Sequence, residues 1–321
     1  MKTIYVKISE QCNLDCKHCY INTKSNEVLD INAFLYWFEQ YKKSTNNDIE
    51  LVFHGGEPLL HADNILNIID NIADSSIQYH ITTNLICELT DSVRKVLATC
   101  TVATSFDGCD VRFTNYAQHY LWERNCEIVK PAQVNVVLTS ELLTLNPKML
   151  FERFILRKIQ NVHFERLTCT GRAKKLNAPS WEEVDEWLCK AHAAWIPEKI
   201  GVTEFGEFSK LCANIEMSGC RLRKCTKNVL TINPNGSIAT CPNTFDKVFA
   251  TIHQPVETLY SSSIYSCITK TEKVLNSICR ICDLYRYCNG DCFQLIWQDK
   301  ICPFPKKLFK KILNEYEIRN S

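Results

Sequence analysis

The sequence has little net charge, few glycines and no long apolar run. Its 37 Lys and Arg residues almost balance its 36 Asp and Glu residues, which leaves a formal net charge of +1. A charge so close to zero gives no electrostatic reason to expect nucleic acid or a membrane surface as a partner. No apolar run reaches the roughly 18 residues that a membrane-spanning helix needs, and the N-terminus lacks the apolar core of a signal peptide. We therefore expect a cytoplasmic protein with no membrane and no nucleic-acid partner.

Cysteine, in contrast, is abundant, with 19 residues. In a secreted protein this number would predict a disulfide framework, whereas in a cytosolic protein it favours metal binding. The segment "EQCNLDCKHCYI" (10–21) places Cys12, Cys16 and Cys19 on one short loop. Three cysteines cannot all pair, and a closed tetrahedral zinc site would need a fourth ligand. Three thiolates can instead hold three irons of a [4Fe–4S] cube and leave the fourth iron open to another ligand, with zinc as the main alternative.

Apolar patterns along the first two hundred residues alternate between strand-like and helix-like segments. Strands are predicted at 3–8, 49–55, 79–83, 101–107, 133–139 and 161–168, and helices at 31–41, 63–72, 89–98, 147–158 and 180–195. The last of these helices has Ser180 as its N-cap and Glu183 at the capping-box position. Such alternation predicts an α/β fold with a parallel sheet, and it fits a partial barrel and an open doubly wound sheet equally well.

The pattern changes near residue 200. Regular periodicity thins beyond it, cysteines crowd together, and turn signals such as "NPNG" (233–236) appear. We therefore predict a first domain at 1–200 and a small cysteine-rich domain, held together by metal, at 201–321. The basic run "PKKLFKK" (305–311) is interpreted as the solvated face of a terminal helix, with a binding patch as the alternative.

The first domain resembles the radical S-adenosylmethionine (SAM) superfamily. Cys12, Cys16 and Cys19 match its C-x3-C-x2-C signature, which in that family follows the first strand of a partial (β/α)6 barrel similar to a TIM barrel. The resemblance thus favours the barrel over the open sheet. It implies that the open iron binds SAM, and that reductive cleavage of SAM yields a 5′-deoxyadenosyl radical. The three cysteines would then be catalytic as well as metal-binding.

The same resemblance implies a set of SAM contacts. The segment "FHGGEPLL" (53–60) contains Gly55 and Gly56, which would let a ligand approach the backbone closely, and such a pair is notable in a chain with nine glycines. Glu57 follows them and can accept hydrogen bonds from the methionine ammonium group. Further candidates for contacts with the ribose, the carboxylate, the adenine or the substrate are Asn84, Ser105, Asp107, Arg112 and His18. Each of these polar side chains could equally be satisfied by neighbouring backbone groups.

A second cysteine pattern follows in the C-terminal part. The segment "CRLRKCTKNVLTINPNGSIATC" (220–241) places Gly236 five residues before its last cysteine, and "CRICDLYRYCNGDC" (279–292) reads C-x2-C-x5-C-x3-C. This resembles the SPASM extension of radical SAM enzymes, which binds two auxiliary [4Fe–4S] clusters. By position, the resemblance implies one cluster on Cys220, Cys225, Cys241 and Cys292, and another on Cys279, Cys282, Cys288 and Cys302. A pair of zinc sites on the same thiolates is the alternative.

Eight further cysteines are not used by these motifs. We interpret seven of them as small buried apolar side chains: Cys87, Cys100, Cys109, Cys126, Cys189, Cys212 and Cys267. Cys169 follows the sixth predicted strand, at the end that would face the cavity of a barrel. We consider it both as a hydrogen-atom donor to a substrate radical and as an inert buried thiol.

The resemblance implies an oxidoreductase that uses SAM and three [4Fe–4S] clusters. Its radical would abstract hydrogen from a peptide or protein side chain, giving an oxidative modification or a cross-link. Fully ligated auxiliary clusters would transfer electrons, and an electron donor such as flavodoxin or ferredoxin is expected. Because the cluster loop begins close to Met1, we expect a peptide substrate to need a separate leader-recognition protein.

Other functions stay open at this point. Sulfatase-maturing relatives carry an aspartate directly after the cysteine that corresponds to Cys241, whereas this chain has Pro242 and Asn243. That branch of the family is therefore disfavoured. The alternatives to a peptide substrate are a small molecule, such as an amino acid, sugar or nucleotide derivative, and a non-catalytic role as an iron–sulfur electron carrier.

Overall fold

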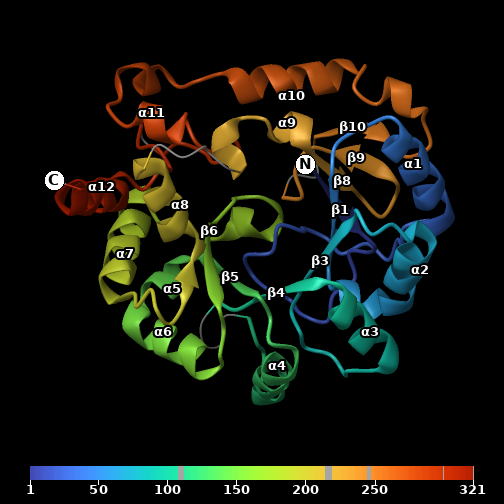
Figure 1. Cartoon of the computed structure of the whole chain (residues 1–321), viewed down its shortest axis with the longest axis horizontal. Coiled ribbons are helices and arrows are strands. Elements are labelled where there is room, and N and C mark those ends of the chain that lie inside the picture. The colour runs from blue at the N-terminus through green and yellow to red at the C-terminus, as the bar shows by residue number, and fades with distance from the viewer. Residues whose placement is uncertain (108–111, 214–218, 244–246, 299, 321) are drawn as a thin grey trace.

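A computed structural model describes residues 1–107, 112–213, 219–243, 247–298 and 300–320. Within these residues a single sheet of ten strands has the order β10-β9-β8-β1-β2-β3-β4-β5-β6-β7. Strands β1 to β6 are parallel and neighbour one another in chain order. A doubly wound sheet would reverse its strand order part-way. The sheet is therefore an unclosed barrel, as predicted (Figure 1).

All six predicted strands are confirmed to within a few residues. Their bounds are Lys2–Lys7 (β1), Ile49–His54 (β2), Gln78–Thr83 (β3), Thr101–Ser105 (β4), Gln133–Leu138 (β5) and Asn161–Arg166 (β6). The intervening helices are Ile31–Lys43 (α1), Ala62–Ile72 (α2), Asp91–Thr99 (α3), Tyr116–Val129 (α4), Ser140–Leu143 (α5), Pro147–Leu156 (α6) and Trp181–Ala194 (α7). Short 3-10 helices follow β2 at Pro58–His61 (η1) and β6 at Gly171–Lys175 (η2).

Helix starts follow the capping chemistry of the sequence. Asp30, Thr90 and Asn146 each accept a backbone N–H of the first turn of their helix. The predicted capping box of Ser180 and Glu183 is present at α7. Helix α4 was not predicted, because its apolar residues do not follow one stripe: Tyr116 and Tyr120 are exposed while Trp122 and Cys126 are buried.

The two faces of the barrel strands differ in chemistry. Outward side chains pack against the helices around the barrel; the ring of Phe164, for example, meets Trp187 of α7 edge-on, with 5.2 Å between centroids. Inward side chains are largely polar and line an internal cavity, among them Thr3, Tyr5, Glu50, His54, His80, Gln133, Asn135, His163 and Glu165. In closed barrels branched apolar side chains fill this space. Here the interior is left for a ligand.

Beyond residue 200 the chain continues the same sheet on both sides. Strand β7 (Gly201–Val202) pairs with β6, and β8 (Val229–Ile232) pairs in parallel with β1. Strands β9 (Ser237–Ala239) and β10 (Val248–Thr251) then add antiparallel to β8. The domain boundary near residue 200 stays a prediction.

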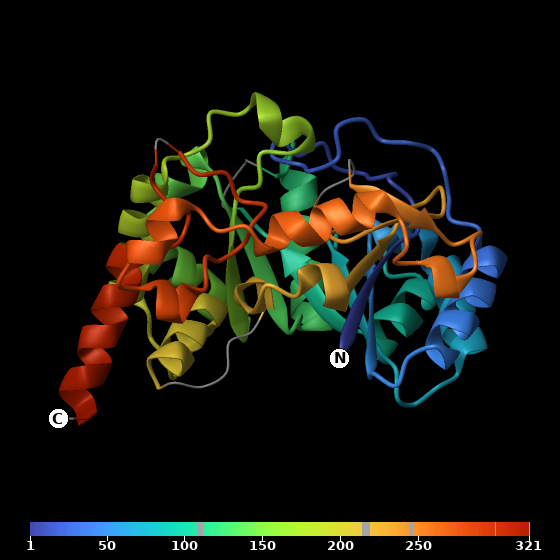
Figure 2. The same cartoon turned by 90° about the horizontal axis from the view of Figure 1, so that it is seen from above.

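The other elements of this part are short, apart from three helices. They are Thr203–Cys212 (α8), Gly219–Leu222 (η3), Cys225–Asn228 (α9), Val256–Thr258 (η4), Ser263–Lys273 (α10), Ser277–Ile281 (η5), Tyr285–Cys288 (α11) and Lys306–Asn320 (α12). Helix α10 runs along the side of β10 and α9 in both views, and α12 projects from the body at the C-terminus (Figure 2).

Most of the cysteines outside the motifs behave as expected. Cys100, Cys126 and Cys212 are buried, and Cys87 and Cys189 are half-buried. The prediction is wrong for Cys267, which is exposed on the polar side of α10. Cys109 lies outside the described residues. Among the described residues, no helix has the length and apolar character needed to cross a membrane.

Candidate active site and cysteine centres

The three cysteines of the N-terminal triad line one cavity of about 160 Å³. They lie on the loop that follows β1, and the carboxyl ends of the neighbouring strands supply the remaining wall. Other predicted contacts that line the same cavity are His18, Gly55, Gly56, Glu57, Asn84, Ser105 and Arg112. The fold therefore gathers into one place residues that are nearly a hundred positions apart in the sequence.

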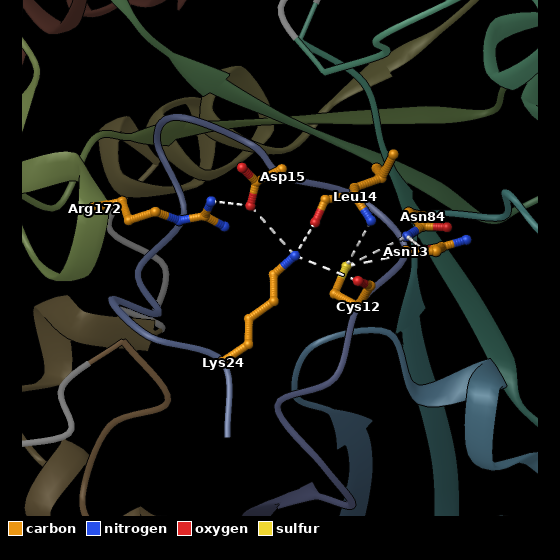
Figure 3. A network of polar contacts seen from close by, with 7 residues as sticks. All are labelled: Cys12, Asn13, Leu14, Asp15, Lys24, Asn84 and Arg172. Carbon is orange, nitrogen blue, oxygen red and sulfur yellow. Dashed lines mark hydrogen bonds and ion pairs between the residues drawn. The ribbon is translucent and has the colours of Figure 1, made fainter. Parts of the chain in front are cut away.

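Hydrogen bonds hold the sulfur of Cys12 (Figure 3). The backbone N–H of Leu14 donates to its Sγ at 3.4 Å, and the side-chain amide of Asn84 lies 3.8 Å from it. Asn84 also donates to Asn13 Oδ1 at 2.7 Å, which ties the end of β3 to the cysteine loop. Burial raises the pKa of the Cys12 thiol to about 11, so the free thiol is protonated at neutral pH and a bound metal would displace its proton. Hydrogen bonds to ligand sulfurs tune cluster potentials, and the position of Asn84 suits that role.

Lys24 and Arg172 fix the loop from the other side. The ammonium of Lys24 donates to the carbonyl oxygens of Cys12, at 3.3 Å, and of Leu14, and it lies 3.4 Å from Asp15 (Figure 3). Arg172, in η2 after β6, pairs with the same Asp15. The loop is thus attached to the last strand of the barrel as well as to the first.

Gly55 and Gly56 bring the end of β2 against the backbone that leads into the triad. A Cβ atom on Gly56 would lie 2.1 Å from the carbonyl oxygen of Gln11, and one on Gly55 would lie 2.4 Å from that of Ser9. Gly56 N donates to Ser9 O at 2.9 Å, which closes the contact. Gly55 also has a φ of +132°, a conformation that favours glycine. The chain's own backbone therefore occupies the space that the sequence analysis assigned to a ligand, although both glycines also line the cavity.

Glu57 is a buried carboxylate, only 2% exposed. Its Oε1 accepts from Leu59 N at 3.0 Å and from Thr83 Oγ1 at 2.6 Å, and its Oε2 accepts from Asn84 N at 2.7 Å. A carboxylate has about four lone-pair sites, so one remains for a further donor. Burial raises the pKa of Glu57, and a bound ammonium group would favour the charged form. The carboxylate is therefore suited to hold an amine.

Asp107 organises two of the other candidates. Its Oδ2 lies 2.6 Å from Arg112 Nη2 and 3.1 Å from His18 Nε2, and its Oδ1 accepts from Val137 N at 3.0 Å. Burial alone would raise the pKa of Asp107, but Arg112 and His18 outweigh it and hold the pKa well below its usual range. The carboxylate is saturated by this chain, and Arg112 and His18 are the groups that face the cavity. Asp107 thus acts by positioning them.

His18 presents an available polar atom. Its Nδ1 is buried and has no hydrogen-bond partner within the described ranges, while its Nε2 is engaged by Asp107. An unpartnered buried polar atom costs about 1–3 kcal/mol, so a ligand that bonds to it is favoured. Together with the incomplete thiolate set and the spare lone pair of Glu57, this donor set fits a [4Fe–4S] cluster with a polar ligand on its open iron.

The first predicted quartet of the C-terminal part also comes together. Cys220, Cys225, Cys241 and Cys292 all line one cavity of about 650 Å³, which occupies the barrel interior. Cys220 hydrogen-bonds to both Cys225 and Cys292, and the bond to Cys225 is the main cause that raises the pKa of Cys220 to about 12. The free thiol of Cys220 is therefore protonated at neutral pH, and a metal would displace its proton on binding.

The second quartet lines a separate cavity. Cys279, Cys282, Cys288 and Cys302 meet there among largely apolar walls formed by Ile278, Tyr285, Trp297 and Phe304. The space is narrow, about 20 Å³, so this donor set matches a [4Fe–4S] cluster by its chemistry more than by its free volume.

Within the described residues no three His, Cys, Asp or Glu side chains converge closely enough to hold a single metal ion. A cube does not require such convergence, because each cysteine ligates a different iron. The arrangement of each cysteine set around a cavity is compatible with a cluster in its middle.

Five polar residues that the sequence analysis missed line both the triad cavity and the 650 Å³ cavity. They are His54, Thr82, Asn135, Glu165 and Asn243, and we call them the junction residues. Four of them occupy inward positions on strands: His54, Thr82 and Glu165 near the carboxyl ends of β2, β3 and β6, and Asn135 in the middle of β5. Strand alternation could have found these four, because each lies on the same face as other cavity-lining residues of its strand.

The junction residues include a hydrogen-bond donor and an acceptor. His54 Nδ1 accepts from Gly55 N at 2.8 Å, and burial lowers the pKa of His54 to about 4. The ring is therefore neutral, with its proton on Nε2. Glu165 Oε1 accepts from Asn243 Nδ2 at 3.3 Å. A polar substrate group at the junction would meet both.

Cys169 lies elsewhere. It lines a cavity of about 230 Å³ together with Trp181 and Gln298, and it is absent from the described linings of the triad cavity and the 650 Å³ cavity. The hydrogen-donor hypothesis gains no support from this position.

Comparison with known proteins identifies the fold's family. Residues 6–133 match the sequence model of the Radical SAM superfamily, a range that includes the triad and Glu57. Residues 6–133 are thus a Radical SAM domain. The match supports an enzyme that uses SAM, and it ends at the first residue of β5, so the C-terminal cysteines lie outside it.

Two relatives align with this chain over different lengths. The uncharacterised protein MJ0907 of Methanocaldococcus jannaschii is 38% identical over 88 residues, which are 26% of this chain and 30% of that protein. The radical SAM cyclopropyl synthase TigE of Paramaledivibacter caminithermalis is 22% identical over an alignment of 357 positions, covering 98% of this chain and 74% of TigE. The chain thus spans less than a third of the first relative.

Solved structures match over most of the chain. The structure of native anSMEcpe with bound AdoMet has a TM-score of 0.81 at 18% identity and covers 99% of this chain and 97% of its own. Streptococcus suis SuiB bound to its precursor peptide SuiA has a TM-score of 0.66 at 18% identity and covers 91% and 72%. At these identities the likeness shows the fold, including the part beyond residue 200.

Proposed function

We propose that this protein uses three [4Fe–4S] clusters and SAM to oxidise a side chain of a peptide or protein, in an oxidative modification or cross-linking reaction. The observation that carries the proposal is the gathering of three cysteine sets around three cavities, two of which share the junction residues. When bound, the clusters and SAM supply a 5′-deoxyadenosyl radical and a route for electrons. The second and third sets would form a SPASM-type domain at 201–321.

The residues of the triad cavity would divide the work of binding SAM. Cys12, Cys16 and Cys19 hold three irons, and Glu57 accepts a hydrogen bond from the amino group through its remaining lone pair. Arg112, oriented by Asp107, offers its remaining N–H groups to a carboxylate. Ser105 lines the same wall and suits a ribose or substrate hydroxyl.

The junction residues would hold the reacting part of the substrate. His54 Nε2–H can donate and Glu165 can accept, so both ends of a polar group are satisfied there. A peptide substrate is supported by two neighbours of the same fold: SuiB was solved with a precursor peptide, and anSMEcpe was solved with the Cp18Cys peptide. A separate leader-recognition protein and a flavodoxin or ferredoxin donor, in the cytoplasm, belong to the same proposal.

A small-molecule substrate is the second candidate. A cavity of about 650 Å³ lies within the usual range of about 300–1,000 Å³ for small-ligand pockets, and its polar wall suits an amino acid, sugar or nucleotide derivative. The alignment with TigE, named a cyclopropyl synthase, keeps other bond-forming outcomes open.

Anaerobic reconstitution tests the proposal. We expect about twelve irons per chain, four for each of three clusters, with no zinc, and release of 5′-deoxyadenosine under a strong reductant. Deuterium transferred from a labelled peptide residue into 5′-deoxyadenosine would identify the substrate class and the position attacked. Four irons with two zincs would contradict the auxiliary clusters. Full iron without 5′-deoxyadenosine would favour the electron carrier instead.

A further inference from the structure

A basic and apolar surface surrounds the second quartet. Residues 273–311 contain eight Lys and Arg residues against three Asp and Glu residues, whereas the rest of the chain is net acidic. The basic run at 305–311, interpreted from sequence as a solvated helix face, opens α12 beside the narrow quartet cavity. We call the exposed or half-exposed side chains next to this quartet the η5–α12 face: Arg280, Ile281, Arg286, Lys306 and Lys310.

The contacts of this face tie its charges to the cysteines. Lys306 lines the quartet cavity and interacts with the thiols of Cys282 and Cys302. Lys310 lies one helical turn further and pairs at 3.0 Å with Asp283, the residue that follows Cys282. Positive charge is therefore held within a few ångströms of two quartet cysteines.

The same place carries a large exposed apolar side chain. Ile281 is 88% exposed and lies between Cys279 and Cys282 in the C-x2-C segment. Cys282 and Cys302 are themselves half-buried. Two cysteines of this quartet therefore lie at a surface that has an apolar centre and a charged rim. Such a pattern is typical of small transient interfaces.

We propose that the η5–α12 face is the docking surface for an acidic one-electron carrier protein, which exchanges electrons through the second quartet. The inference rests on the proposed function, because the second quartet must hold a cluster. Complementary charge would steer the carrier to the face, and Ile281 would form the apolar centre of the interface, from which water is excluded. Transfer of one electron between the carrier and the cluster then needs no other reactant. A nucleic acid is the competing occupant of a basic surface.

Binding and electron transfer are tested with a reduced acidic flavodoxin as the probe. Its NMR shifts on titration report binding, and bleaching of the reconstituted holoenzyme in a stopped-flow instrument reports electron transfer. We expect the double variant Arg280→Glu, Lys310→Glu to bind the flavodoxin more weakly and to be bleached about tenfold or more slowly than wild type. The bleaching rate of this variant should also depend less on salt concentration. Ile281→Asp should weaken binding at every salt concentration. Lys95→Glu, an exposed change on α3 across the barrel, is the matched control and should behave as wild type.

The outcomes separate the docking surface from the proposed function. Equal rates and shifts for wild type and the charge-reversed variant, with about twelve irons in each, would overturn the docking surface alone. Charge-dependent binding in a chain that holds only four irons would keep the docking surface but overturn the auxiliary clusters, and with them electron exchange through the second quartet. Bleaching by dithionite, which needs no docking, verifies that the variants keep their clusters. Salt-dependent binding of single-stranded RNA that is lost in the same variant, without carrier binding, would also overturn the proposal.

Discussion

The triad cavity and the second quartet cavity both offer cysteine thiols, but they differ in the number of thiols and in the polarity of the surrounding walls. The triad supplies three thiols in a polar cavity, where Glu57 keeps a lone pair and His18 keeps an unbonded Nδ1 among the described residues. The quartet supplies four thiols among apolar walls. An incomplete ligand set with spare polar atoms can receive a further molecule, whereas a complete set cannot. Under the proposed function, this difference would make the triad the site of the chemistry and the quartet a site for electron transfer.

The two sites also depend on the fold to different degrees. The triad comes from eight consecutive positions, and local hydrogen bonds such as Leu14 N–H to Cys12 Sγ shape it. The quartet draws on η5, α11 and the segment before α12, which span residues 279–302 and must pack against one another before the four thiols meet. Changes that loosen packing should therefore affect the quartet before the triad.

The largest predicted effect breaks the triad. Cys16→Ala would remove one of the three proposed iron ligands, and among the described residues that line this cavity no fourth thiol can replace it. We expect complete loss of 5′-deoxyadenosine formation and of about four irons, while the quartet clusters remain. Iron analysis and chromatography of the reaction mixture measure both. Retained SAM cleavage by this variant would contradict the assignment of the triad.

The corresponding change in the second quartet should lower the iron content without stopping SAM cleavage. Cys282→Ala should remove about four irons yet leave reductive SAM cleavage in place, because the triad cavity is untouched. Turnover of the substrate should fall at least a hundredfold if electrons leave through this cluster. Cys267→Ala, an exposed cysteine on α10, is the control and should change neither quantity. Loss of SAM cleavage in Cys282→Ala would erase the functional distinction between the two sites.

A third prediction compares two carboxylates, one at each site. Asp107 is fully buried against Arg112 and His18, while Asp283 is exposed beside Lys310. Asp107→Asn leaves the Arg112 charge buried without its partner, and we expect a loss of about 3–5 kcal/mol in the free energy of unfolding. Asp283→Asn should have no measurable effect on unfolding. Urea denaturation of both variants measures the difference.

The stabilisation by Asp107 should also depend on pH in a definite direction. The folded-state pKa of Asp107 is depressed, so its stabilisation is present above its ordinary pKa near 4 and is lost as the pH falls through the lower folded value. Wild type should therefore lose stability below about pH 4 more steeply than Asp107→Asn. Parallel acid curves would mean that Asp107 does not carry a charge in the folded state.

The sequence predicted those parts of the fold and site that rest on local patterns. Six strands and the triad loop follow from alternation and spacing, and the strand order followed only from the family resemblance. Helix α4 was missed because Tyr116 and Tyr120 are exposed apolar residues that blur its stripe. Long-range contacts left no local trace in the sequence: Gly56 is required by the carbonyl oxygen of Gln11, a backbone group 45 positions earlier.

The junction residues were missed for a related reason. A single polar residue in a strand carries no motif, and only the assembled barrel shows that His54, Asn135 and Glu165 face the same space. Asp107 was predicted as a direct contact because its segment matched the family. The structure instead surrounds it with Arg112, His18 and Val137 N, so its effect on a ligand passes through those side chains.

The smallest predicted effect probes the wall of the 650 Å³ cavity, where the first quartet meets the barrel. Burial lowers the pKa of His163, but its ion pair with Glu204 outweighs burial and raises the pKa to about 8. Because the pKa is raised in the folded state, the charged His163 stabilises the fold fully below its ordinary pKa near 6.5, and this contribution is lost as the pH rises through 8.

We expect the free energy of unfolding to fall by about 1 kcal/mol between pH 6 and pH 9, a value reduced for solvent screening because the side chain is 37% exposed. Glu204→Gln should remove the pH dependence and leave the triad's SAM cleavage unchanged, as thermal unfolding and product analysis across this pH range can measure. A wild-type curve that stays flat would mean that His163 is neutral, and that the first quartet faces an uncharged wall.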